Sequence, residues 1–427
     1  MLPLRFCVSQ RWNHIARSFK PEQTTDVATS VDKAMLDCFW SLLRITRGGA
    51  HHDALACLPI KHGGCGLPSL RTSLIPAYTG SWLARQHERL RTGTKPLSVD
   101  NAADIGILLE RFLDEVDLPA SAVFSLTDVR TVMQCGYPKA QQRLSSCQAT
   151  ANRRSFETNA PADLVAVMKA TTELPEFLEK SSGEIPATGA GAWMLAVPVE
   201  KSHTLSNPAI CSSYWRRLRV PACLPGSTCS YRTAEGRQCS AELDPCLDHP
   251  NTCCRKWINV RHNLMRDTWS DLNRQAHAWA DTEQILPRSM TDDSEMAKIA
   301  DVRVVESDGI CPKWYDIAVT CHEISSMVRR KDAHYKCENA HACDKVIPIV
   351  FNTNGAPSPE TAVAVRKLAA RLAVPSDLLG CRDLDSADEV SEAAWSRAVT
   401  YVRRTLSVCL QRGNWMVMAG SVPDLWR

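Results

Sequence analysis

The chain has 427 residues, of which 44% are hydrophobic and 23% charged, so it can bury two or three domain cores and is not a disordered tail. A net charge of +3 does not by itself indicate a nucleic-acid-binding protein. The charge is uneven, however, because ten Arg and Lys but only six Asp and Glu residues lie between Ile210 and Gln275.

Helices are predicted for most of the first two hundred residues. Two segments place apolar residues on one helical face, and these residues are Val31, Met35, Phe39, Leu42 and Leu43 in the first and Ile105, Leu108, Leu109 and Phe112 in the second. Between them, Gly63, Gly64 and Gly66 predict a tight turn before a helix that begins near Pro76. This glycine cluster lacks the G-K-[ST] ending of a phosphate-binding P-loop. The segment 145–164 is predicted to be a surface linker.

The chain contains nineteen cysteines, a number that suits either disulfides or reduced thiols that bind metal. The first twenty residues lack the apolar core of a signal peptide, and no run approaches the roughly 18 apolar residues of a membrane-spanning helix. Without a route to an oxidising compartment, metal binding is the better interpretation.

One metal site is predicted from the pattern C-x9-C-x9-H-x3-C, formed by Cys229, Cys239, His249 and Cys253. Three thiolates and one imidazole suit a closed tetrahedral zinc site. The spacing is looser than a C-x2-C pair, so three further cysteines compete as ligands, namely Cys223, Cys246 and Cys254. Buried free thiols or a degenerate finger remain the alternatives.

A basic helix is predicted directly after this site, in RKWINVRHNLMRDTWSDLNRQ. One apolar face is expected to contain Trp257, Val260 or Arg261, Leu264, Thr268 and Leu272. Positive side chains around this face can contact phosphates, and the candidate nucleic-acid-binding residues are Arg255, Lys256, Arg261, His262 and Arg266. The alternative is a helix face that is merely solvated.

A β-hairpin is predicted around Asp308-Gly309, between strands at 299–306 and 313–320. Pairing centred on this turn places Asp301 opposite Asp316. Two carboxylates so close repel each other unless a proton or cation lies between them, so the pair is a candidate Mg²⁺ site. Pro312 could introduce a bulge that shifts this pairing, and an acidic pair on a solvated strand is the alternative.

The remaining C-terminal sequence predicts a strand in VIPIVFNT and helices in ETAVAVRKLAARL and SRAVTYVRRTLSVCLQ. The predicted fold is α+β overall, with a C-terminal α/β domain. The predicted regions are helices at 1–145, a linker with connecting helices at 146–209, the zinc knuckle with its basic helix at 210–275, and the α/β domain at 276–427.

Several of these passages are similar to the reverse transcriptases of non-LTR retrotransposons. LPIKHGGCGLPSLRTSLIPAYTGSWL resembles the segment that follows their polymerase core. GAGAWMLAVPVEK and then YWRRLRVPACLPGSTC resemble the passage into their zinc knuckle, and the similarity continues through Arg261–Asn263. The resemblance covers most of the chain through the order of short motifs. It implies thumb-like helices, a zinc knuckle and a restriction-endonuclease-like domain of the PD-(D/E)xK type.

Such nuclease domains carry a PD motif, a second acid and a K-x-x-K-Y motif. Asp301 stands at the first acid but follows alanine instead of proline, Asp316 matches the second acid, and Lys331 begins the third motif, in which His334 replaces the second lysine. The resemblance implies that Asp301 and Asp316 hold Mg²⁺ while Lys331 or Lys336 assists. It also places Glu283 where these folds often have a helical glutamate.

The resemblance implies a protein that nicks target DNA, so that the new 3′-hydroxyl primes reverse transcription from the element's RNA. The expected partners are target DNA and element RNA, with neither a membrane nor a small-molecule substrate, and the expected location is the nucleus. A polymerase palm is not expected, because the sole Asp-Asp pair, Asp292-Asp293, lacks the aromatic residue and strands of that motif. The alternatives are a catalytically decayed, nucleic-acid-binding remnant and an unrelated zinc-containing scaffold protein.

Overall fold

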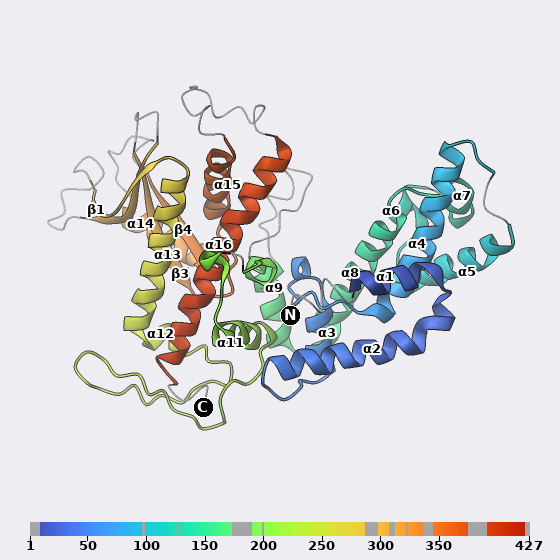
Figure 1. Ribbon diagram of the computed structural model, residues 1–427. Coiled ribbons are helices and arrows are strands. Elements are labelled where there is room, and N and C mark those ends of the chain that lie inside the picture. Colours follow the sequence, from blue (N-terminus) through green and yellow to red (C-terminus); the bar gives the residue numbers. More distant parts are fainter. Residues whose placement is uncertain are drawn as a thin grey trace. The chain divides into compact units, whose positions relative to one another are not determined.

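The computed structural model describes residues 9–95, 99–126, 128–172, 190–198, 200–286, 298–306, 312–321, 323–335, 345–374 and 391–422. The chain divides into two compact units, Met1–Met168 and Lys169–Arg427 (Figure 1). The first is helical and the second contains a mixed sheet covered by helices, so the predicted α+β fold is confirmed. Asp292-Asp293, Asp308-Gly309 and Lys336 lie outside the described residues.

The N-terminal unit is built from short and medium-length helices. Their bounds are α1 Ser9–Ser18, α2 Pro21–Leu42, α3 Ala50–Cys57, η2 Ile60–His62, α4 Leu70–Arg91, α5 Val99–Val116, α6 Ala120–Phe124, α7 Val129–Cys135, α8 Ala140–Asn159 and α9 Ala162–Thr172, the last of which crosses into the second unit. The helix α4 contributes to both local cores: it packs with α1 and α2 on one side and with α5 to α8 on the other.

Most of the predicted apolar faces in this unit are confirmed. All four residues predicted for α5 are buried. Of those predicted for the first segment, Met35, Phe39 and Leu43 are buried, Val31 is half-buried and Leu42 is 50% exposed. The predicted linker at 145–164 is wrong, because α8 runs through most of it. Leu144, Ala149 and Phe156 lie on the buried side of that helix, and its polar residues lie on the solvated side. The helix α4 also begins six residues before Pro76, which it accommodates internally.

The glycine cluster forms the predicted tight turn. Gly63 and Gly66 have φ values of 84° and 68°, in the left-handed region that side chains with a Cβ avoid. Gly64 packs directly on the backbone, and a Cβ added to it would lie 2.1 Å from the carbonyl oxygen of Leu58. The turn therefore needs glycine for two separate reasons.

Gly64→Ala is expected to destabilise the N-terminal unit by about 1–3 kcal/mol, because the new methyl group must displace backbone. Gly106→Ala is the matched control with the opposite sign. Gly106 lies inside α5, where an added Cβ would meet nothing within 4 Å, so alanine should stabilise by about 0.5–1 kcal/mol. Urea unfolding of the two full-length variants, followed by circular dichroism, measures both changes. Equal effects of the two substitutions would contradict the close packing at Gly64.

The C-terminal unit contains a four-stranded sheet and, at 392–419, the longest helix among the described residues. Its elements are η3 Ala192–Leu195, η4 Lys201–His203, α11 Asn207–Leu218, α12 Pro250–Cys253, α13 Arg255–Gln275, β1 Trp279–Ile285, β2 Ile299–Val305, β3 Lys313–Thr320, α14 Ile324–Tyr335, β4 Val346–Asn352, α15 Pro359–Ala373 and α16 Glu392–Ala419. The strands lie in the order β1-β2-β3-β4. The first three are antiparallel and β4 is parallel to β3.

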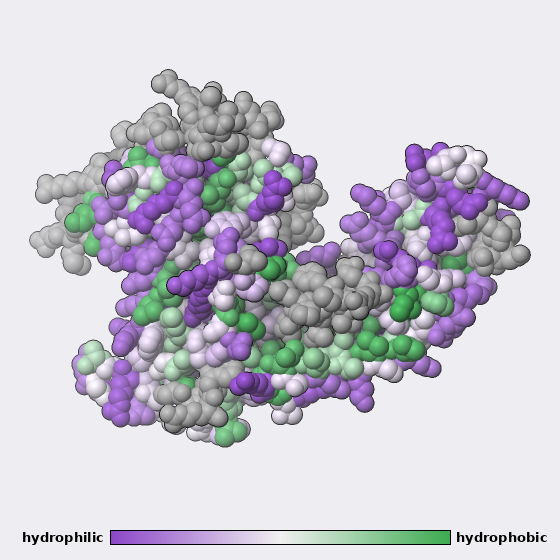
Figure 2. Space-filling view, viewed as in Figure 1, coloured by the Kyte–Doolittle hydropathy of each residue, from purple (hydrophilic) through white to green (hydrophobic). Residues whose placement is uncertain are grey.

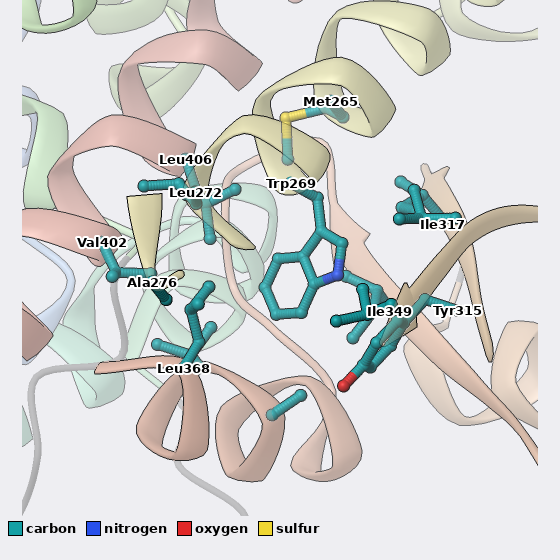
Figure 3. Close-up of a cluster of buried hydrophobic side chains, with 14 of the residues drawn as sticks. Met265, Trp269, Leu272, Ala276, Tyr315, Ile317, Ile349, Leu368, Val402 and Leu406 are labelled. Atoms are coloured by element: carbon teal, nitrogen blue, oxygen red, sulfur yellow. The ribbon is translucent and has the colours of Figure 1, made fainter. Parts of the chain in front are cut away.

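One face of the sheet is covered by α13, α15 and α16. Trp269 of α13 lies at the centre of this core, where its ring meets Tyr315 edge-on at 5.4 Å (Figure 3). The opposite face is covered by α14, whose Val328 packs on Ala318 and Val350. The outer side of α13 is largely hydrophilic on the face seen in Figure 2. The sheet is therefore enclosed on both sides, and residues at its strand ends are held in fixed positions.

Candidate metal centre and carboxylate pair

Cys229 and Cys239 are brought together by a small hairpin. Backbone bridges join Thr228 to Glu242 and Arg232 to Gln238, and Gly236 supplies the left-handed conformation of the turn, with φ of 79°. These bridges place the two cysteines on adjacent chain segments, where Cys229 N–H donates to the carbonyl of Ala241 at 2.8 Å. The hairpin thus positions the first two sulfur ligands.

His249 and Cys253 are positioned by a loop and one helical turn. The Asp244 carboxylate accepts hydrogen bonds from the backbone N–H groups of Cys246, Asp248 and His249, at 2.8–3.1 Å, and fixes the loop that carries the histidine. Pro250 then begins α12, which places Cys253 one turn after His249. The last two ligands therefore share one short rigid segment.

The four predicted ligand atoms converge. They all lie within 4.8 Å of one another, with the Cys229 and Cys253 sulfurs 3.5 Å apart and the Cys239 sulfur 3.3 Å from Nε2 of His249. A tetrahedral zinc ion with Zn–S bonds of about 2.3 Å needs ligand separations of roughly 3.5–3.8 Å. The prediction of this group as a site that could bind a zinc-like ion is confirmed.

The chemistry of the group also fits a cation. Burial, followed by the neighbouring thiols of Cys254 and Cys229, raises the pKa of Cys253. Thiols crowded in this way resist ionisation unless a positive charge is present, and zinc supplies that charge when it binds thiolates. The ligand set is thus one that a zinc ion would hold in its deprotonated form.

The three competing cysteines take other roles. The Cys254 sulfur lies 2.6 Å from Oγ of Ser421 and 3.5 Å from the Cys253 sulfur, so it packs between the cluster and Ser421. Cys223 donates to the carbonyl of Asp244 at 3.5 Å, and Cys246 is buried. Among the residues that the structure describes, none of the three belongs to the converging ligand group.

The predicted phosphate-contacting residues of α13 divide into two groups. Arg255 and Lys256, at its beginning, are exposed beside the cysteine cluster, as expected for such contacts. The prediction for Arg261 is wrong, since its side chain is only 2% exposed. It donates to the amide oxygens of Asn251 and Asn414 and packs where Gly413 leaves room, because a Cβ there would lie 2.5 Å from Cγ of Arg261.

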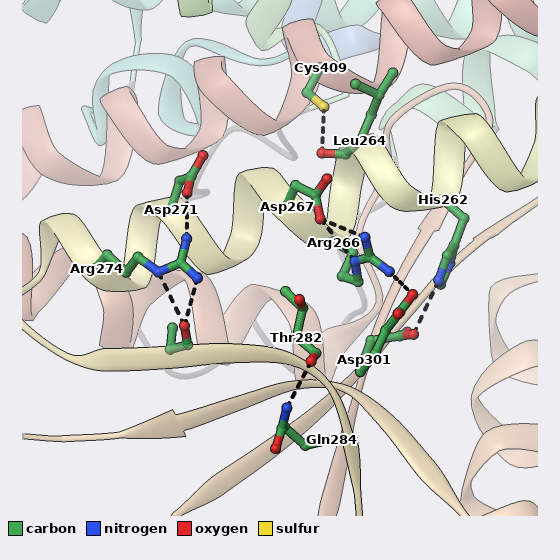
Figure 4. Close-up of polar contacts among 12 residues, drawn as sticks. His262, Leu264, Arg266, Asp267, Asp271, Arg274, Thr282, Gln284, Asp301 and Cys409 are labelled. Atoms are coloured by element: carbon green, nitrogen blue, oxygen red, sulfur yellow. Dashed lines mark hydrogen bonds and ion pairs between the residues drawn. The ribbon is translucent and has the colours of Figure 1, made fainter.

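His262 and Arg266 face the sheet (Figure 4). His262 Nε2 lies 3.1 Å from Oδ1 of Asp301, and Arg266 pairs with the carboxylates of Asp267 and Glu283. The contact between His262 and Asp301 was not predicted. No local sequence signal reveals it, because 39 positions separate the two residues. His262 therefore contacts the carboxylate pair, and Arg266 is paired with two other carboxylates.

The predicted hairpin register is confirmed where the strands pair. Val302 lies opposite Tyr315 and Val304 opposite Lys313, so Pro312 does not shift the pairing. The ladder ends there, and the Asp301 carboxylate accepts the N–H of Ile317 at 2.6 Å in place of a further backbone bond. Asp301 thus inserts its side chain where β2 and β3 separate, beside Asp316.

Asp316 is buried and paired with a lysine. Its side chain is 4% exposed, and Lys331 Nζ of α14 lies 2.6 Å from Oδ2. Burial, with the hydrogen bond and charge of Asp301, raises the pKa of Asp316 to about 7, although Lys331 opposes the shift. Burial opposes ionisation of Asp301 as well, but hydrogen bonds from His262, Asp316 and Ile317 N–H outweigh it and lower the Asp301 pKa. The pair therefore holds one shared proton in mildly acidic solution.

Two further residues border the pair. Tyr335 donates to the carbonyl of Ile299 at 2.9 Å, and burial together with Asp316 and Asp301 raises its pKa. Glu283 is not on a helix as predicted but in β1, because Trp279–Ile285 pairs with β2. Its φ of 54° breaks the ladder opposite Asp301, and its side chain is 66% exposed and bound to Arg266. Glu283 thus lies beside the pair without entering it.

Neither a protein-family model nor a curated protein matches this chain. Helices within the described ranges are all too short or too polar to cross a membrane.

Proposed function

We propose that the C-terminal unit is a metal-dependent endonuclease that nicks DNA, held next to nucleic acid by the zinc-knuckle region. The observation that supports this most directly is the convergence of Asp301, Asp316 and Lys331 from two strands and one helix. Two acids can hold a divalent cation for phosphodiester hydrolysis, and a lysine beside them can stabilise charge on the phosphate. The resemblance to PD-(D/E)xK nucleases concerns these same three residues.

The carboxylate pair fits a hard divalent cation. Asp316 is buried and Asp301 is half-buried beside it. Their two carboxylates repel each other, and a shared proton and Lys331 reduce this repulsion. A bound cation would relieve it. Bound by these two residues, Mg²⁺ would place positive charge on a phosphodiester oxygen and lower the pKa of a nearby water.

The surrounding side chains have separate positioning roles in this proposal. His262 donates to Asp301 and keeps that carboxylate oriented and ionised. Lys331 carries positive charge beside Asp316, where it can stabilise charge that develops on the phosphate. Arg255 and Lys256, exposed at the start of α13, would contact backbone phosphates without reading sequence. In this proposal the nick leaves a 3′-hydroxyl that primes reverse transcription from an element RNA, and the site of action is the nucleus.

A second candidate is a binding protein of the same architecture that does not cut. His334 favours it, because the histidine stands where the nuclease motif has its second lysine. Both candidates share the zinc-dependent fold and differ only in cleavage.

Supercoiled plasmid distinguishes them in the presence of Mg²⁺ or Mn²⁺. We expect nicking by the wild-type chain and a loss of roughly a hundredfold or more in Asp316→Ala, because that variant lacks one of the two cation-binding carboxylates. Asp281→Asn is the matched control, since Asp281 lies on the neighbouring strand and pairs with Arg303 at 3.7 Å, outside the pair. Plasmid binding by wild-type protein without nicking in either metal would replace the endonuclease with the binding protein.

A further inference from the structure

The end of α14 is fastened to the start of β2, beside the carboxylate pair. Tyr335 Oη donates to the carbonyl of Ile299 at 2.9 Å, and the Tyr335 ring packs on the buried cluster that contains Ala300. His334 precedes Tyr335 and Lys298 precedes Ile299, so this contact brings His334 and Lys298 close to each other. Two polar side chains from different elements therefore meet at the edge of the candidate site.

His334 lies near two lysines. It is exposed at the end of α14, and Lys331 lies one turn before it on the same helix. Partial burial, followed by the positive charges of Lys298 and Lys331, lowers the pKa of His334. The imidazole is therefore neutral at pH 7, and the positive charge at this edge comes from the two lysines.

Of these two lysines, Lys298 is the one without a carboxylate partner. Lys331 Nζ lies 2.6 Å from Oδ2 of Asp316, and Asp301 is engaged by His262. Lys298 is half-buried and forms no ion pair within the described ranges. Its backbone carbonyl accepts the N–H of Leu286 at 2.9 Å, which fixes the chain there and leaves the side chain uncommitted. One positive charge beside the pair is thus available to an anionic ligand.

We propose that Lys298 binds a backbone phosphate of the DNA strand at the carboxylate pair, next to the phosphate that is cut. Three residues of extended chain separate Lys298 from Asp301, a distance of about 10 Å, so the lysine would meet a neighbouring phosphate while the pair acts on the scissile one. An ammonium group contacts phosphate as a point charge and needs no fixed fork geometry. This inference rests on the proposed function. It also explains how the site keeps a phosphate-binding charge although His334 is not a lysine.

Affinity for a short DNA duplex, measured by fluorescence anisotropy without divalent cations, tests Lys298 separately from cleavage. In the zinc-loaded full chain, Lys298→Gln should weaken binding roughly tenfold at about 0.1 M salt, as for loss of one phosphate contact. The slope of log affinity against log salt concentration should become shallower by about one. A merely structural role would not change that slope. Lys367→Gln is the charge-matched control and should keep both values, because Lys367 is exposed on α15, which covers the opposite face of the sheet from α14.

Moving the charge to α14 is the second test. His334→Lys, added to Lys298→Gln, should restore the affinity and the slope, because a lysine at 334 would reach the same phosphate. The proposal would be overturned by a wild-type chain that does not bind the duplex, by Lys298→Gln with the affinity and slope of wild type, or by a double variant as weak as Lys298→Gln. Nicking is scored separately on plasmid. A chain that shows the expected binding changes without nicking would overturn the endonuclease and leave the phosphate contact in place.

Discussion

Replacing Cys239 with serine is expected to remove zinc from the purified chain and to unfold the segment between Thr228 and Cys253. Hydroxyl oxygen is a poor ligand beside two thiolates and an imidazole, and the free energy of zinc binding is folding free energy, about 10–16 kcal/mol in zinc-finger peptides. Even a fraction of this free energy exceeds the loss of stability that most single substitutions cause. Elemental analysis of bound zinc and thermal unfolding followed by circular dichroism measure the two effects.

The damage should extend beyond the hairpin. Ser230 N–H and Oγ both donate to the carbonyl of Ser421 at the end of α16, and Met418 of that helix packs on Leu243 and Leu247. Unfolding of the cluster would therefore expose one end of the longest helix in the core. Cys223→Ser is the control and should keep one zinc per chain, because Cys223 lies outside the converging ligand group. Zinc retained by Cys239→Ser but lost from Cys223→Ser would show that the ligand set is wrong.

Asp316→Asn is expected to stabilise the protein at pH 8 by about 2–4 kcal/mol when zinc is bound and Mg²⁺ is absent. The pKa of Asp316 rises from its ordinary 3.8 to about 7, so the folded state holds a proton that the unfolded state releases between these values. Wild-type stability from this group therefore falls as pH rises from about 4 to about 7 and stays low above that. Asparagine is neutral throughout and avoids this loss.

Urea unfolding of both proteins at pH 5 and pH 8 measures this difference. The advantage of Asp316→Asn should be large at pH 8 and smaller at pH 5, because most of the wild-type loss of stability occurs between pH 5 and the folded pKa of about 7. Mg²⁺ or Mn²⁺ at pH 8 should stabilise the wild type, since in the proposed site the cation binds the ionised pair of carboxylates. The same ions should leave the stability of Asp316→Asn unchanged. If Asp316→Asn raised the free energy of unfolding equally at both pH values, the carboxylates would not share a proton.

Some features of this protein could be predicted because short-range patterns determine them. The register of β2 and β3 was predicted from the Asp308-Gly309 signal and the alternating residues around it. Asp301 and Asp316 were therefore predicted as neighbours, and they are found beside each other. The zinc ligands were predicted from residue type and spacing alone. In both cases, few chain conformations satisfy the local chemistry.

Other features depend on tertiary packing, which sequence periodicity does not reveal. The buried face of α13 contains Met265 and Trp269 where Leu264 and Thr268 were predicted. Arg261 and Leu272, two of the positions expected on this face, are buried with them, and His262, the position after Arg261, contacts Asp301. The helix α8 was missed for a related reason, because its four buried residues, Ala140, Leu144, Ala149 and Phe156, are spaced too widely among polar ones for a strong periodic signal.

The helix α13 also limits how this chain can vary in length. Cys253 belongs to the converging cysteine and histidine group just before the helix, and His262 contacts the carboxylate pair from within the helix, nine residues later. One residue inserted between them would turn everything beyond it by about 100° and shift it by about 1.5 Å. Either the cysteine would leave its cluster or the histidine would lose Asp301. Insertions and deletions in this segment should therefore be excluded even where single substitutions are harmless.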